Sequence, residues 1–151
     1  MRLVPKLKVF AVVCAVVLSS CVSGCHGEPR RYHRVDENAL RSSAVRMILP
    51  AYPRQSASSG TEGVAVADLE LAEDGSVRNV AVLESPDSEI AREVSAAMKQ
   101  WKFAVAPPER TGGLAVRGKL THYFVIEAGN GVVLTPTEES ARRARSTRGG
   151  V

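Results

Sequence analysis

The sequence predicts an α+β fold, in which a small antiparallel β-sheet of order β-β-α-β carries one helix packed across one face. Three observations lead to this prediction. Apolar residues alternate with polar ones on both sides of an Asp-Gly pair within residues 63–85, which is typical of a two-stranded hairpin. Apolar residues then recur at helical spacing from 90 to 101, and another alternating run occupies residues 114–126.

The hairpin is predicted from Gly63 to Ser85. Asp74-Gly75 forms its turn, because glycine supplies the positive φ that a tight turn requires. The apolar residues expected to face the core are Ala65, Ala67, Leu69 and Leu71 before the turn, and Val77, Val80 and Val82 after it. Asp68 and Glu70 share the other parity, which predicts a solvent-facing side and not an acid–base pair.

A helix is predicted after the hairpin, with Ser85 or Ser88 as its N-cap. Its apolar positions fall on one helical face, and they are Ile90, Val94, Ala97, Met98 and Trp101. We expect Trp101 to pack in the core, because a large aromatic side chain at a helix end is more often a packing residue than a ligand-stacking one.

The third strand is predicted from Leu114 to Ile126. Its two parities differ in character, with Val116, Leu120, Phe124 and Ile126 on the apolar side and Arg117, Lys119 and Tyr123 on the other. His122 shares the apolar parity, so we expect it to be a packed histidine. We expect this strand to lie at an edge of the sheet. Residues 132–134 are a candidate short extra strand.

The charge pattern separates the ends of the chain from its middle. The formal net charge is +4, but residues 50–134 carry eight basic and eleven acidic residues, a net charge of −3. The basic residues that dominate the total therefore lie in the two ends. This distribution argues against a nucleic-acid partner, which would require the basic patch on the folded domain.

The N-terminus is predicted to be a lipoprotein-type signal peptide over residues 1–20. A charged start precedes the ten-residue apolar run Val9–Leu18, which is too short to span a hydrocarbon core of about 30 Å as a helix. The residues before Cys21 resemble a bacterial lipobox, and those before Cys25 fit the same pattern, so either cysteine is a candidate for lipidation, with Cys21 preferred. The alternative is an uncleaved inner-membrane anchor.

Three further segments complete the predicted domain organisation. Residues 21–49 are predicted to be an Arg-rich tether with a short helix from Asp36 to Met47, capped by the Asp36 side chain. Residues 50–134 are the predicted globular domain. Residues 135–151 are predicted to be a basic, largely disordered tail, although Thr137 to Glu139 fit the start of a small helix.

No pattern of catalytic or metal-binding residues emerges. The three histidines are scattered and form no zinc-type pair, and all three cysteines lie within the first 25 residues. The chain has no nucleophile-elbow motif, and Gly112-Gly113 precedes a strand where a phosphate loop would precede a helix. The sequence therefore favours a binding protein without a cofactor over an enzyme.

Residues 50–126 resemble the C-terminal domain of TonB-type energy transducers. The resemblance is carried by the joint spacing of several residues, none of them diagnostic alone: Tyr52, Pro53, Gly63, Asp74, Gly75, Trp101 and Phe103, followed by a proline and by a strand that ends in Phe124. It implies a periplasmic module that binds outer-membrane receptors by β-augmentation, in which a receptor peptide adds to the last strand. The residues that would supply this edge are Leu114, Val116, Gly118, Leu120, His122 and Phe124.

The chain also departs from the full transducer pattern. It has no long Pro-rich spacer, and its N-terminal apolar run contains no charged or polar contact for a membrane motor. Our leading hypothesis is a lipid-anchored, periplasm-facing module, with the outer membrane favoured as its location, that binds an outer-membrane receptor or another envelope transport protein. The alternatives are an active transducer with an uncleaved inner-membrane anchor, and a structural envelope lipoprotein. An exposed strand edge would also permit a strand-exchanged homodimer.

Overall fold

The fold is organised around a long central strand and the hairpin that pairs with it. The structure is a computed structural model that describes residues 31–104 and 111–148. The predicted signal peptide, Cys21 and Cys25 lie outside the described residues. In the described part of the chain, no helix is long and apolar enough to cross a membrane.

The predicted hairpin is confirmed as strands β3 (Gly63–Leu71) and β4 (Val77–Glu84), which pair antiparallel. At the turn, Asp74 Oδ1 accepts a hydrogen bond of 2.9 Å from the Ser76 backbone N–H. Gly75 has φ +80°, and a Cβ atom there would lie 2.1 Å from the Phe103 carbonyl oxygen. Glycine is therefore required at this turn both for its conformation and for the close approach of the backbone.

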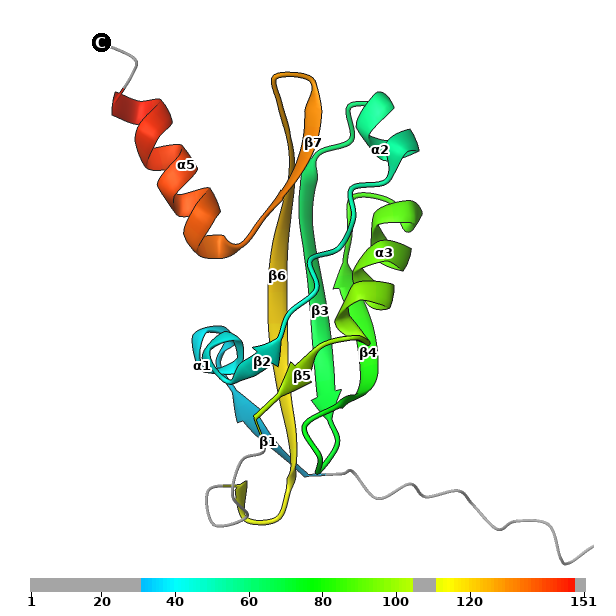
Figure 1. The fold of residues 1–151 in the computed structure, drawn as a ribbon, viewed down its shortest axis with the longest axis vertical. Helices are drawn as coiled ribbons and strands as arrows, with labels where there is room; N and C mark the ends of the chain where they lie inside the picture. Colours follow the sequence, from blue (N-terminus) through cyan, green and yellow to red (C-terminus); the bar gives the residue numbers. More distant parts are fainter. Residues whose placement is uncertain (1–30, 105–110, 149–151) are drawn as a thin grey trace, which may run out of the picture. The chain divides into compact units, whose positions relative to one another are not determined.

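The predicted helix is confirmed as α3 (Ser88–Met98), and its apolar face packs on the hairpin (Figure 1). The N-cap is Asp87, not Ser85 or Ser88, because the Asp87 carboxylate accepts a 2.7 Å hydrogen bond from the Ile90 N–H. The buried residues of the helix are those predicted: Ile90, Val94, Ala97 and Met98. They meet the alternating face of β3, where Ala65, Ala67, Leu69 and Leu71 are buried.

The main sheet has five strands, and β6 (Ala115–Glu127) lies in its interior. Figure 1 shows β6 running beside β3 along its length. On the side of β6 away from β3, β1 (Tyr32–Val35) pairs in parallel and β7 (Asn130–Leu134) pairs antiparallel. The prediction of an edge strand was therefore wrong, and the sheet is mixed because β1 runs parallel to β6.

The N-terminal segment differs from the predicted tether. Helix α1 (Glu37–Ser42) has Asp36 as its N-cap, as predicted, but it ends five residues before Met47. The chain then extends into β2 (Ala44–Arg46), which pairs with β5 (Lys102–Phe103) in a small second sheet. Pairing with a distant segment ends the helix, since the Ala104 N–H donates a 2.7 Å hydrogen bond to the Ser43 carbonyl. A short helix, α2 (Arg54–Ser58), precedes β3.

The C-terminal segment also differs, since helix α5 (Pro136–Arg148) replaces most of the predicted disordered tail. Its start is a capping box, in which the Thr135 N–H donates to Glu138 Oε2 at 2.8 Å and the Glu138 N–H donates to Thr135 Oγ1 at 3.4 Å. One turn further, Glu139 is 3% exposed and pairs with Arg142 and Arg143, each at 2.6 Å. The clustered arginines thus stabilise a helix instead of repelling one another.

The face of the sheet that carries Asp68 and Glu70 is less exposed to solvent than predicted. Asp68 and Glu70 are 6% and 8% exposed. The neighbouring strand accounts for this, because the Arg117 Nε lies 3.1 Å from an Asp68 carboxylate oxygen, and the Arg117 guanidinium lies 4.9 Å from the centre of the Tyr32 ring. Arg117 of β6 therefore covers Asp68, and Arg78 of β4 lies 3.9 Å from the Glu70 carboxylate.

Candidate functional site

The predicted partner-binding residues lie in the middle of the sheet and not along a free border. Leu114 precedes β6 and is 39% exposed, and Val116 is partly buried against the core. The remaining four residues are buried on the core-facing parity of the strand, namely Gly118, which has no side chain, and Leu120, His122 and Phe124. Their side chains are therefore packing groups, and only the backbone of β6 is a candidate for strand pairing.

The backbone border of β6 away from β3 is covered in two stretches. Positions 115–118 pair with β1, with Tyr32 opposite Ala115 and Val35 opposite Gly118. Positions 123–127 pair with β7, from Tyr123 to Glu127. Between them, residues 119–122 have no strand partner on this side among the described residues. We refer to this whole border, residues 115–127, as the outer border of β6.

Two side chains of α1 close the gap by binding Thr121. The Thr121 N–H donates to Glu37 Oε1 at 2.8 Å, and its hydroxyl donates to Glu37 Oε2 at 2.8 Å. The Thr121 carbonyl accepts a 2.6 Å hydrogen bond from Arg41 Nη2. Glu37 and Arg41 also pair with each other at 2.9 Å. A carboxylate and a guanidinium thus replace the backbone partners that a neighbouring strand would give Thr121.

Arg41 of α1 also reaches the aromatic part of the core. The Arg41 guanidinium lies 5.9 Å from the centre of the Trp101 ring, and Trp101 meets His122 edge-on at 6.2 Å. The Trp101 Nε1–H donates a 2.7 Å hydrogen bond to the Ile48 carbonyl. Trp101 is 2% exposed, which confirms its predicted role in packing.

His122 is a packed histidine, as predicted. It is fully buried, and burial, followed by the nearby charge of Arg41, lowers its pKa to about 4. Neither ring nitrogen has a hydrogen-bond partner in the described part of the chain. The ring is therefore neutral at neutral pH and contributes apolar packing against Trp101.

The residues that carry the family resemblance form a packing cluster around these elements. The Tyr52 hydroxyl donates to the Thr61 carbonyl, and the Tyr52 ring meets Phe124 edge-on at 5.3 Å. Phe103 is 1% exposed, stacks at 5.8 Å from Trp101, and donates its N–H to the Gly75 carbonyl at 2.9 Å. The spacing of the motif residues therefore reflects packing within the fold and does not mark a catalytic or ligand-binding site.

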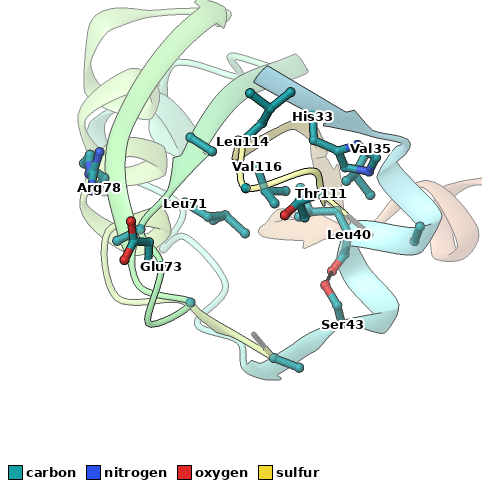
Figure 2. Close-up of a pocket in the computed structure, with 16 residues that line it drawn as sticks. His33, Val35, Leu40, Ser43, Leu71, Glu73, Arg78, Thr111, Leu114 and Val116 are labelled. Atoms are coloured by element: carbon teal, nitrogen blue, oxygen red, sulfur yellow. Dashed lines mark hydrogen bonds between the residues drawn. The ribbon is translucent and has the colours of Figure 1, made fainter. Parts of the chain in front are cut away.

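A pocket of about 600 Å³ lies next to the start of β6. Figure 2 shows Leu71 and Val116 in its middle, Leu40 of α1 on one side and Glu73 on the other. Its lining is mostly apolar, and among the described residues no group of three or more His, Cys, Asp or Glu side chains could hold a metal ion. Residues 104 and 111, which flank the undescribed stretch 105–110, also line it, so the pocket alone does not indicate a ligand.

Sequence reasoning missed the elements that cover β6. The segment Tyr32–Val35 contains aromatic and β-branched residues, but its arginines and its short length favoured a linker. Glu37 and Arg41 lie four residues apart on α1, a spacing that predicts an ion pair but not a contact with Thr121. The signals of order in this region were the Asp36 cap and the helical spacing of Leu40, Ala44, Met47 and Ile48.

The family model for the Gram-negative bacterial TonB protein C-terminal matches residues 49–126. The chain is 36% identical over 84 residues to Protein TonB from Pseudomonas aeruginosa, a match that covers 55% of this chain and 24% of that relative. The solution NMR structure of the Pseudomonas aeruginosa TonB C-terminal domain is 32% identical, with a TM-score of 0.46, and covers 56% of this chain and 85% of that one.

Proposed function

Because the chain belongs to the family of Gram-negative TonB C-terminal domains, we propose that it is a protein-binding module of the cell envelope whose partner is an outer-membrane transport protein. The family match over residues 49–126 is the observation that carries this proposal. The packing of the motif residues supports it, since Tyr52, Trp101 and Phe103 hold together the sheet that would present the binding border. The proposed role is binding and not catalysis.

Recognition is proposed to occur by β-strand addition on the side of the sheet formed by β1, β6 and β7. Strand addition gives affinity through backbone hydrogen bonds and specificity through alternate side chains. A partner strand could pair at two places on this side. One is the outer border of β6, and the other is β7, which pairs only with β6 among the described strands. The opposite border is β4, which pairs only with β3 in the described chain and serves as the internal control.

Hydrogen–deuterium exchange with receptor peptides tests this proposal. The full chain in detergent is incubated with synthetic N-terminal segments of outer-membrane receptors from the same bacterium, and amide protection is mapped by mass spectrometry. We expect at least one peptide to bind and to change exchange in β1, β6 or β7 while leaving β4 unchanged. Absence of binding across the panel, or protection confined to β4, contradicts the proposal.

Attachment to the membrane is proposed to occur through lipid on Cys21 or Cys25. The support is the resemblance of the preceding residues to a lipobox, together with an apolar run too short to span a bilayer. Intact-mass measurement of the mature protein is the test. Loss of residues 1–20 or 1–24 with added acyl mass is expected, whereas a retained N-terminus favours the alternative of an inner-membrane transducer.

A further inference from the structure

The first described segment of the chain covers the part of the outer border of β6 that a partner strand would need. We call residues Tyr32–Ser42, which comprise β1 and α1, the β1–α1 segment. Strand β1 pairs with positions 115–118, and Glu37 and Arg41 bind both backbone groups of Thr121. This segment therefore satisfies the same backbone groups that an added strand would use.

The contact between this segment and β6 is close. A Cβ atom at Gly118 would lie 2.9 Å from Leu40 Cδ2 and 2.9 Å from the Val35 carbonyl oxygen. Glycine at this position lets both β1 and α1 approach the strand directly. The β1–α1 segment is thus fitted to β6 and does not rest loosely against it.

Few contacts nevertheless hold this segment on the sheet. Strand β1 has four residues and pairs only with β6 among the described strands, whereas β3 pairs with β6 over eight residues. In α1 only Leu40 is buried, and in β1 Val35 is partly buried against the core. The other contacts are the hydrogen bonds of Glu37 and Arg41 to Thr121 and the cation–π contact of Tyr32 with Arg117. Elements with few buried apolar contacts open locally at a lower free energy than the rest of a domain.

The tie at Thr121 can be exchanged with another ligand. Glu37 and Arg41 bind the backbone N–H and carbonyl of Thr121, and a strand paired beside residues 119–122 would offer these groups its own backbone carbonyl and N–H. Glu37 begins helix α1, so its side chain takes the place that the backbone of a continuing strand would occupy.

We propose that the β1–α1 segment is an internal substitute for the partner strand. It occupies β6 from Ala115 to Thr121 and leaves when an extended peptide pairs there. The peptide pairs with β6 through its backbone, including the N–H and carbonyl of Thr121 that Glu37 and Arg41 now bind. This inference rests on the proposed function, because it names the part of the sheet where the partner strand is accepted.

A peptide copied from the chain itself provides the probe. A fluorescent peptide of residues 31–42 is titrated into the full chain in detergent, as wild type and as Glu37→Gln. Removing hydrogen bonds to the carboxylate weakens the internal competitor, so we expect the Glu37→Gln chain to bind the peptide about tenfold more tightly than wild type does. A peptide that itself carries Glu37→Gln should lose this gain.

Glu89→Gln is the matched control, because Glu89 is a carboxylate on α3 that pairs with Arg92 away from β6. It should bind the peptide as wild type does. Hydrogen–deuterium exchange completes the test: Glu37→Gln should accelerate exchange in residues 115–121 but not in β3. Equal peptide binding by all three chains, or unchanged exchange at 115–121, would overturn the proposal and make the segment a fixed part of the fold.

A reversible covalent lock guards against a variant that fails to fold. His33 and Val116 are opposite each other in the β1–β6 pair, so cysteines at both positions can bridge when the three native cysteines are replaced by serine. Peptide binding should disappear when this chain is oxidised and return when it is reduced. Equal peptide affinity in the oxidised and reduced chain would refute the inference. Because the peptide copies the chain, binding of this peptide without binding of any receptor peptide would refute only the proposed function.

Discussion

Gly118→Ala is expected to loosen the β1–α1 segment while leaving the rest of the fold intact. The added Cβ would lie 2.9 Å from both Leu40 Cδ2 and the Val35 carbonyl oxygen, closer than such atoms pack. Overpacking of this kind costs typically about 1–3 kcal/mol. Both atoms that would have to move belong to the β1–α1 segment, and neither belongs to the hairpin or to α3.

The expected result is a local change. Hydrogen–deuterium exchange should accelerate roughly tenfold in β1, α1 and residues 115–121, since 1.4 kcal/mol corresponds to a factor of ten in an opening equilibrium. Exchange in β3 should change little. The copied peptide should gain nothing from this variant, because the methyl group blocks its Val35 and Leu40 in the same way.

Gly131→Ala is the matched comparison in β7, further along the same border of β6. A Cβ atom there would lie 2.6 Å from the Tyr52 ring, so this variant should accelerate exchange in β7 and leave β1 unchanged. If Gly118→Ala instead accelerates exchange equally in β1 and in the β3–β4 hairpin, the segment is not a separate unit. The reasoning about its release would then be wrong.

Three further predictions concern the core. Gly75→Ala should lower the free energy of unfolding by more than about 3 kcal/mol in urea denaturation, because it combines a positive φ with a Cβ 2.1 Å from the Phe103 carbonyl oxygen; a loss below about 1 kcal/mol would contradict this. Trp101→Phe should cost about 2 kcal/mol in the same assay, because the part-buried Ile48 carbonyl loses its 2.7 Å hydrogen bond and a buried indole is replaced by a smaller ring, and an unchanged urea midpoint would argue against it. The pKa of His122 is about 4 in the fold and 6.5 unfolded, so the unfolded chain binds the proton more readily and stability falls as the pH drops from about 6.5 towards 4. This contributes a loss of about 2 kcal/mol between pH 7 and pH 5, which His122→Leu should abolish; an identical pH dependence in both proteins would disprove it.

The sequence predicts the parts of this fold whose signals are local. Alternation around Asp74-Gly75 and the spacing from Ile90 to Met98 both follow from the geometry of one element, so the hairpin and the core face of α3 could be derived without coordinates. Helical spacing and aromatic size predicted that Trp101 lies in the core, and strand parity predicted the same for His122.

The position of β6 in the sheet could not be derived in this way. Whether a strand lies at a border depends on which distant segments pair with it, and the pairing of Tyr32 with Ala115 joins residues more than eighty positions apart. The end of α1 has the same origin, since Ser43 is taken up by a hydrogen bond from Ala104. For α5, the capping box at Thr135 was a local signal that the run of arginines obscured.

The kind of contact that closes a strand border determines how it can be opened. A border covered by apolar side chains leaves a cavity when the cover departs, whereas hydrogen bonds can pass to any competitor that offers the same donors and acceptors. At Thr121 the cover is a carboxylate and a guanidinium, and at Arg117 it is the Tyr32 ring. Leu40 is the one fully buried apolar side chain of α1. At Thr121 the border is therefore held closed by side-chain hydrogen bonds that the backbone of a partner strand can replace.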